Sequence, residues 1–200
     1  MRKGDSTRQT ILDHATQLAS QVGLTGLTIG QLADDLDLSK SGLFSHFQSK
    51  EALQLQVLEH GAESFIECVV RPALAQPRGV PRLRALFERW LAWDGKLPGG
   101  CVFVAAASEL DDRPGSVRDR LVELQRQWIG VITTSFRKAI EVGHVAADAD
   151  PEQFAQDLYG IMLVWHHHTR LLGDATAEAR ARRAFDALLS VAATNPILRS

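Results

Sequence analysis

The amino-acid sequence predicts an all-α protein, and three observations carry this prediction. Apolar residues recur three and four positions apart along almost the whole chain, which is the spacing of one helix face. Alternating runs rich in β-branched residues, which are typical of strands, are absent from the sequence. Several periodic segments are followed by a glycine, as at Gly23 and Gly143, where a helix commonly ends. Together these patterns predict nine helices.

Residues 28–47 have the pattern of two short helices joined by a tight turn. Thr28 can cap the first helix, and Gln31, three residues later, can complete a capping box. Residues 37–39 are too few for more than a turn, and Ser39 can cap the second helix. This arrangement describes a helix-turn-helix, whose second helix can enter a major groove of DNA.

The sequence after residue 47 predicts further helices, several of them longer. One of them opens at Lys50-Glu51 and ends near Pro72, and residues 75–81 form the clearest linker. Another starts at Pro151 and is apolar on two sides, so each side must be covered by something. Further helices are expected over residues 83–91, 102–107, 117–142 and 176–193.

The composition restricts the class of protein. With 45% hydrophobic and 23% charged residues, the chain is typical of globular proteins. No apolar run approaches the ~20 residues that cross a bilayer, and the amino-terminal residues lack the apolar core of a signal peptide. We therefore expect a cytoplasmic protein with no membrane partner. The net charge is −2, and residues 1–50 carry five basic and five acidic side chains, so any DNA contact depends on where individual cations lie.

The segment from Thr28 to Leu53 resembles the DNA-binding region of the TetR family of bacterial transcriptional regulators. The likeness runs through residues 28–33 and 38–53 without a gap, and it includes His46-Phe47 followed by Lys50-Glu51. It implies a homodimer that binds a palindromic operator in double-stranded DNA.

The likeness also implies individual DNA contacts. The positions that usually touch phosphate are Thr28, Lys40, His46 and Lys50, and those at the groove-facing start of the recognition helix are Ser41, Gly42 and Leu43. Ser39 lies with them at the amino end of this helix, where unpaired backbone amides and the helix dipole favour phosphate. One position departs from the family, because Phe44 stands where tyrosine is usual and the hydroxyl contact to phosphate is missing.

Residues 98–103 and 113–119 resemble a recurring version of the family's carboxy-terminal domain. We therefore expect a DNA-binding domain over residues 1–48 and a ligand-binding and dimerisation domain over residues 49–200. The likeness implies a repressor that a small apolar or aromatic ligand releases from its operator, with two chains joined through the helices of residues 151–172 and 176–193. The candidate ligand contacts are Cys101, Phe103, Trp128, Met162 and Trp165.

Other interpretations stay open beside this one. A helical hairpin of purely structural use, or a DNA-binding regulator without a ligand, would share much of the pattern. Cys101 lies at an expected helix start, where a thiol can become reactive, so a thiol or electrophile sensor is a further alternative to a small buried residue. A nucleophile elbow, a phosphate loop and a His-Glu metal motif are all absent from the sequence, so we predict neither an enzyme nor a cofactor.

The run His166-His167-His168 invites a metal interpretation. Neighbouring helix positions point about 100° apart, however, so at most one or two of these rings could face the same ion. No acidic residue stands three or four positions away from them. We therefore predict no metal site, and expect these residues to line a pocket or an interface.

Overall fold

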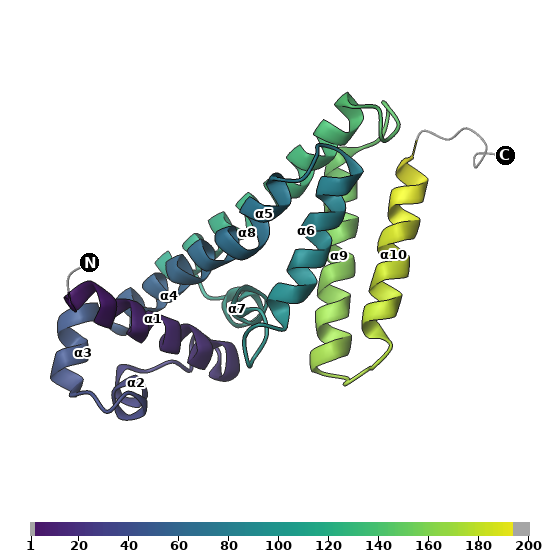
Figure 1. Cartoon of the computed structure of the whole chain (residues 1–200). Helices are drawn as coiled ribbons and strands as arrows, with labels where there is room; N and C mark the ends of the chain where they lie inside the picture. Colours follow the sequence, from purple (N-terminus) through teal and green to yellow (C-terminus); the bar gives the residue numbers. More distant parts are fainter. Residues whose placement is uncertain (1–2, 194–200) are drawn as a thin grey trace. The chain divides into compact units, whose positions relative to one another are not determined.

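Helices form all the regular structure in the part of the chain that the computed structural model describes, residues 3–193, with side chains from residue 8 onward (Figure 1). Because α4, η1 and α5 follow one another without a break, these residues contain nine continuous helices, which confirms the predicted fold class and number. In chain order the elements are α1 (Lys3–Val22), α2 (Ile29–Asp35), α3 (Lys40–Phe47), α4 (Lys50–Phe65), the π-helical η1 (Ile66–Val70), α5 (Arg71–Leu74), α6 (Val80–Asp94), α7 (Val102–Leu110), α8 (Ser116–Glu141), α9 (Pro151–Arg170) and α10 (Ala177–Ala192).

The chain divides into two compact units. Unit 1 contains the residues up to 65 together with residues 95–125, and unit 2 contains residues 66–94 and the residues from 126 onward. The three head helices α1, α2 and α3 therefore belong to the same unit as α4, α7 and the first part of α8. Over residues 3–193 no helix has the length and apolar content needed to cross a membrane.

Side-chain caps define the two short helices of the head. The Thr28 hydroxyl accepts a hydrogen bond from the amide of Gln31 at 3.1 Å, and the Ser39 hydroxyl accepts one from the amide of Gly42 at 3.1 Å. Asp37 lies between the two helices with φ of 53°, a left-handed conformation that makes the turn tight. The helix-turn-helix predicted from these capping residues is confirmed.

One apolar core runs through the whole of unit 1. It joins buried residues of the head to buried residues of α4, α7 and α8, among them Leu32, Leu43, Phe47, Leu53, Val57, Val102, Ala106, Leu110 and Leu121. The head helices thus do not close a core of their own, because α4 and α7 complete it. A substitution in this shared core therefore affects the position of α3 as well as the stability of the unit.

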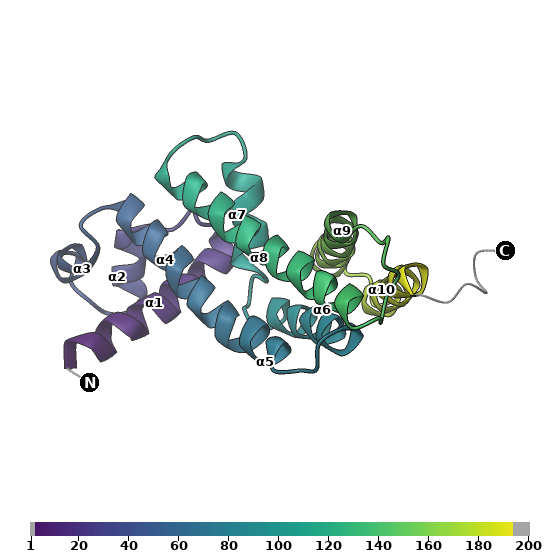
Figure 2. The ribbon, with the colours of Figure 1, turned by 90° about the horizontal axis from the view of Figure 1, so that it is seen from above.

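Aromatic stacking dominates the interior of unit 2. The rings of Phe87 and Phe185 stack with centroids 4.4 Å apart, and those of Phe136 and Phe154 stack at 4.1 Å. Figures 1 and 2 show α9 and α10 side by side along most of their length. The two predicted carboxy-terminal helices therefore form an antiparallel pair within unit 2.

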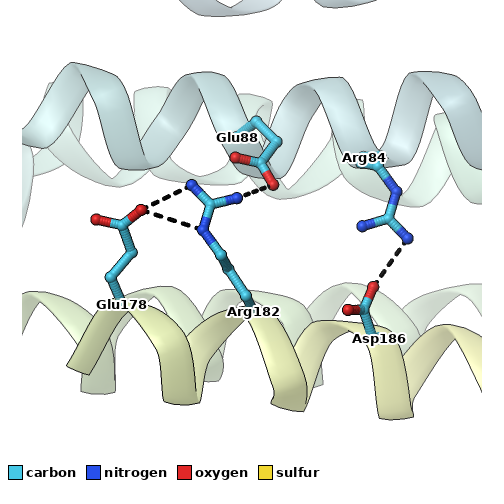
Figure 3. Close-up of polar contacts among 5 residues, drawn as sticks. All are labelled: Arg84, Glu88, Glu178, Arg182 and Asp186. Carbon is cyan, nitrogen blue, oxygen red and sulfur yellow. Dashed lines mark hydrogen bonds and ion pairs between the residues drawn. The ribbon is translucent and has the colours of Figure 1, made fainter. Parts of the chain in front are cut away.

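Ion pairs attach α10 to α6 on the outside of this unit (Figure 3). Arg182 of α10 binds Glu88 of α6 and, at 2.8 Å, Glu178 of its own helix. The hydrogen bonds to Glu178 and then to Glu88 raise the pKa of the Arg182 guanidinium. Arg84 of α6 binds Asp186 of α10 at 2.8 Å. These exposed pairs fix which way α10 faces and add little to stability.

The long helix from Lys50 continues two residues beyond Pro72, near which the sequence predicted its end. Pro72 lies in the first turn of α5, directly after η1. Pro72 has no backbone N–H to donate within this continuous helix, and the changed hydrogen-bonding pattern of the π-helical η1 just before it lets the helical path continue through the proline.

Candidate nucleic-acid interface

Helix α3 has one buried side and one exposed side. Leu43 and Phe47, one turn apart, are fully buried in the core of unit 1. Ser41 and Ser45 are exposed, and at 100° per residue they lie on the side opposite this buried pair. Phe44 flanks the exposed side with 52% of its surface accessible. The exposed side thus presents two hydroxyl groups and one aromatic ring.

The amino end of α3 is small and polar. The hydroxyl oxygens of Ser39 and Ser41 lie 3.3 Å apart, beside the amide of Gly42 that Ser39 caps. A Cβ atom placed on Gly42 would lie 3.0 Å from the Ser39 hydroxyl, with no other described neighbour within 4 Å. A larger side chain at Gly42 would press on the capping hydroxyl of Ser39 and would otherwise project outward from the start of the helix.

Two of the predicted phosphate contacts come together at the start of α2. A Cβ atom placed on Gly30 would lie 3.7 Å from the Lys40 ammonium and 4.0 Å from the Thr28 hydroxyl. The Lys40 side chain thus reaches back from α3 to the capped end of α2. This places a cation beside a helix terminus whose amides favour an anion.

The other two predicted phosphate contacts lie apart from this pair. Lys50 is exposed at the start of α4, and its ammonium donates to the carbonyl oxygen of Thr25 at 2.5 Å. His46 is half-buried near the end of α3, with its ring 6.2 Å from that of Phe47. The Lys50 side chain therefore connects the start of α4 to the loop between α1 and α2.

One predicted contact needs correction, and one residue was missed. Leu43 is 0% exposed because it shares the buried side of α3 with Phe47, so its side chain packs in the head and cannot face a DNA groove. Ser45 was not predicted, although it is exposed and lies one turn after Ser41 on the same side. Helical spacing counted from Leu43 could have found it.

The predicted ligand contacts are divided between the two units. Cys101 is the N-cap of α7 and is 2% exposed, and the half-buried ring of Phe103 meets that of Phe65 edge-on at 6.3 Å, all within unit 1. Trp128, Met162 and Trp165 are buried in unit 2, where the ring of Trp165 meets that of Trp90 at 5.7 Å. The three residues of unit 2 form the candidate effector group.

An apolar groove of about 360 Å³ lies between α9 and α10 on unit 2. Val164, at its lining, is 59% exposed and adds to this apolar surface. The lining residues are Gly160, Ile161, Val164, Trp165, His168, Ala177, Arg180, Ala181 and Ala184. The groove is therefore a candidate site for another apolar surface.

The three consecutive histidines do not converge. His166 binds Asp94 of α6 at 2.6 Å, and Asp94 is 1% exposed, whereas His168 lies 3.5 Å from Asp174. Over residues 8–193 no three side chains of the metal-binding types gather in one place. The first histidine serves as the partner of a buried carboxylate, which local sequence spacing could not reveal.

Comparisons with known proteins agree with this geometry. A family model described as "Bacterial regulatory proteins, tetR family" matches residues 11–57, and one described as "Tetracyclin repressor-like, C-terminal domain" matches residues 79–185. The chain is 25% identical over 152 residues, 76% of each chain, to the HTH-type transcriptional repressor DhaR of Mycobacterium sp. (strain GP1).

Two solved structures show the same fold. A TetR transcriptional regulator from Chloroflexus aurantiacus J-10-FL superimposes with a TM-score of 0.84 and 26% identity, covering 95% of this chain and 96% of that one. AibR, in complex with isovaleryl coenzyme A and operator DNA, superimposes with a TM-score of 0.71 and 22% identity, covering 92% of this chain and 97% of AibR.

Proposed function

The chain belongs to the TetR family of bacterial DNA-binding transcriptional regulators, and from this premise we propose that it is a repressor, released from a palindromic operator by a small apolar or aromatic ligand. Residues 1–48 bind DNA, and residues 49–200 bind the ligand and pair two chains. We assign the protein no catalytic activity, no metal and no cofactor, and place it in the cytoplasm.

The exposed side of α3 reads base edges in the major groove. The observation that carries this proposal is the division of α3 into a buried side and a small, hydroxyl-bearing exposed side. The hydroxyl groups of Ser41 and Ser45 can donate to or accept from base edges, and the ring of Phe44 flanks them. Gly42 lets the helix backbone approach the groove closely.

Phosphate contacts position this helix without reading sequence. Thr28 and Lys40 supply them at the start of α2, Ser39 at the start of α3, and Lys50 at the start of α4, with His46 as a further contact. Because residues 1–50 carry no net charge, each cation has to meet a phosphate directly. Binding should therefore depend only moderately on salt, because few phosphate contacts contribute to the slope.

A second copy of the chain covers the groove between α9 and α10. A two-fold dimer of this kind would contribute two helices from each chain to a four-helix interface. Two recognition helices are needed to read half-sites roughly 34 Å apart, which is one turn of DNA. The exposed Val164 supports this arrangement, because a partner chain would remove it from water.

The effector acts by linkage between its own site and the DNA site. We propose that Trp128, Met162 and Trp165 of unit 2 contact the ligand, while Cys101 and Phe103 at the start of α7 remain predicted contacts. AibR, a protein of the same fold, holds an acyl coenzyme A and operator DNA in one complex. A ligand that prefers a conformation unsuited to DNA weakens DNA binding by its coupling free energy.

Library selection tests the proposed DNA function. The purified chain is used to select from a pool of random DNA duplexes, and the affinity for the recovered duplex is compared with that for a random duplex. We expect a two-fold symmetric sequence, bound roughly a thousandfold more tightly than random DNA at physiological salt. A chain that recovers no common sequence over repeated rounds would contradict the proposal.

A thiol or electrophile sensor is the second candidate, and one observation favours it. Cys101 is the N-cap residue of the nine-residue helix α7, a position at which cysteines of other proteins can be reactive. Its burial to 2% exposure, however, restricts access by a reagent. If the thiol senses, Cys101→Ser removes the response to an alkylating agent while operator affinity stays the same.

A further inference from the structure

We infer that Glu109 of α7 is a positioning residue for DNA binding, because it fixes the loop between α1 and α2 on which Lys50 and Thr28 are held. The inference rests on the proposed DNA interface. It assigns a role in DNA binding to a residue far from the helix-turn-helix in sequence, whose carboxylate takes no direct part in the contact with DNA.

One carboxylate accepts three hydrogen bonds from this loop. The amide of Leu24 donates to Glu109 Oε1 at 3.1 Å, and the amide and the hydroxyl of Thr25 both donate to Oε2 at 2.7 Å. Hydrogen bonds to an ionised acceptor are stronger than those between neutral groups. The donors lie 84 and 85 residues before the acceptor in the sequence. These hydrogen bonds therefore join the loop to a helix that is distant along the chain.

The same two loop residues are bound from the other side by α4. The carbonyl oxygen of Thr25 accepts from the ammonium of Lys50 at 2.5 Å, and the carbonyl oxygen of Leu24 accepts from the side-chain amide of Gln54 at 2.8 Å. The loop therefore uses its donors toward α7 and its acceptors toward α4. A shift of Thr25 away from Glu109 would carry the Lys50 ammonium with it.

Gly23 permits this close approach. It has φ of +80°, and a Cβ atom placed on it would lie 2.3 Å from Glu109 Oε1. A second contact lies before the start of α7, where the amide of Gly99 donates to the hydroxyl of Ser20 at 3.0 Å. A Cβ atom on Gly99 would lie 1.6 Å from the backbone oxygen of Ser20. The end of α1 is thus fastened both to the last turn of α7 and to the residues before the start of α7.

The two effects that Glu109 can have on DNA binding oppose each other. As a negative charge within the DNA-binding unit it would repel phosphate, so that removing the charge would strengthen binding to any duplex. As a positioning residue it holds Lys50 and the start of α2 in place, so that removing it would weaken binding to the operator. The sign of the change therefore decides between a charge and a positioning role.

The test uses Glu109→Gln in the full-length chain, with Glu63→Gln as the control. Glu63 is exposed on α4 in the same unit, so its substitution makes the same change of charge. Binding to the duplex recovered by selection and to a random duplex is titrated over a range of salt concentrations. Glutamine keeps one acceptor oxygen and turns an NH2 group toward the loop amides, which cannot accept it.

We expect Glu109→Gln to lose roughly tenfold in operator affinity and to lower the salt slope by about one phosphate contact, while Glu63→Gln changes neither. Lys50→Ala should then have little further effect in the Glu109→Gln background, because the contact is already misplaced. Additive effects of the two substitutions would show that Glu109 acts on stability alone and would overturn the inference. So would tighter or unchanged binding by Glu109→Gln.

A milder variant keeps the inference testable if Glu109→Gln fails to fold. Thr25→Val removes the hydroxyl donor to Oε2 and leaves the backbone hydrogen bonds. It should therefore show a smaller loss of operator affinity and a smaller decrease of the salt slope. Wild-type operator affinity with a wild-type salt slope would count against the role of Glu109. A wild-type chain that selects no sequence would instead contradict the DNA-binding proposal itself. Failure of the inference and failure of the proposed function are thereby distinguished.

Discussion

Unit 1 and unit 2 differ in the contacts that hold them together and in the apolar side chains that they leave exposed. In unit 1 partly buried carboxylate contacts supplement the apolar core, since Glu109 holds the loop after α1 and Glu59 of α4 holds Arg120 of α8 at 2.8 Å. The hydrogen bond to Glu59, followed by that to Glu123, raises the pKa of the Arg120 guanidinium. In unit 2 stacked rings fill the interior, but apolar side chains such as Val164 and Leu171 stay exposed on or just after α9.

This difference indicates what each unit binds. Unit 1 buries most of its apolar residues within one chain, and the exposed side of α3 presents hydroxyl groups, flanked by Phe44, to a charged, hydrogen-bonding partner. Unit 2 leaves an apolar groove that a single chain does not cover. The comparison therefore predicts that substitutions on the exposed face of unit 2 change assembly, whereas those on the exposed face of unit 1 change DNA binding alone.

The largest effect is expected at the groove of unit 2. Val164→Glu places a charge on the apolar surface that a second copy would cover, so the chain should sediment near 22.0 kDa instead of twice that mass. Loss of the dimer should lower operator affinity by roughly a hundredfold or more, because the two half-sites are then bound independently. Val142→Glu, which introduces the same charge outside the groove lining, is the control.

A monomeric parent chain would contradict this prediction at once. So would a Val164→Glu variant that remains a dimer with full operator affinity. Either result would mean that the apolar groove serves another purpose, and the contrast between the two units would no longer concern assembly.

The next effect concerns the two sides of α3 within unit 1. Leu43→Ala removes a fully buried side chain and should lower the free energy of unfolding by about 2–5 kcal/mol. Phe44→Ala, at the neighbouring exposed position, should change it by less than about 1 kcal/mol. Urea unfolding of the two variants measures the difference. Equal losses would show that α3 does not have the buried and exposed sides described above.

A smaller effect is expected from restoring the family's usual residue on α3. Phe44→Tyr adds a hydroxyl group to an exposed ring, which can then donate to phosphate. Affinity should rise a few-fold for operator and random duplex alike, because a phosphate contact carries no sequence information. Anisotropy titrations of both duplexes measure it. A gain confined to the operator would instead place this ring against base edges.

The smallest effect is expected at the polar start of α10 in unit 2. The hydroxyl and the amide of Thr176 both donate to Asp174, at 2.7 and 2.8 Å, and lower the pKa of that carboxyl to about 2. The stabilisation is therefore present above pH 3.8, the ordinary value, and is lost as the pH falls through about 2. Thr176→Val removes the hydroxyl bond and should raise the pKa of Asp174 toward 3.8, as measured by carboxyl NMR titration. An unchanged titration would contradict it.

Local features of the fold could be predicted from the sequence because their causes are local. Thr28, Ser39 and Asp150 each cap a helix that begins one residue later, and each was recognisable from the residues that follow it. The glycine after α1 and the glycine after α8 both have positive φ, as helix ends commonly require. Such features depend on neighbours within four residues.

Features that depend on distant residues could not be predicted. The carboxylate that holds Thr25 lies 84 residues away, and the partner of His166 lies 72 residues away, so no spacing rule connects them. Leu43 belongs to the segment that faces the groove in the family, yet its side chain is buried. Consecutive residues of a helix point to different sides, so not every side chain of this segment can face the groove. The spacing of the apolar residues Leu43 and Phe47 separates these sides, so this burial, unlike the distant contacts, could have been predicted from the sequence.

The most direct test of the account compares Gly42→Leu with Lys50→Ala by titration on the selected operator and on random duplex over several salt concentrations. Gly42→Leu should lose operator preference by bulk at the groove while binding to random duplex stays nearly the same. Lys50→Ala should weaken both duplexes together and lower the salt slope by about one, with its operator preference intact. Full operator preference in Gly42→Leu would show that α3 does not read the bases, and wild-type binding by Lys50→Ala at every salt concentration would remove Lys50 from the phosphate contacts.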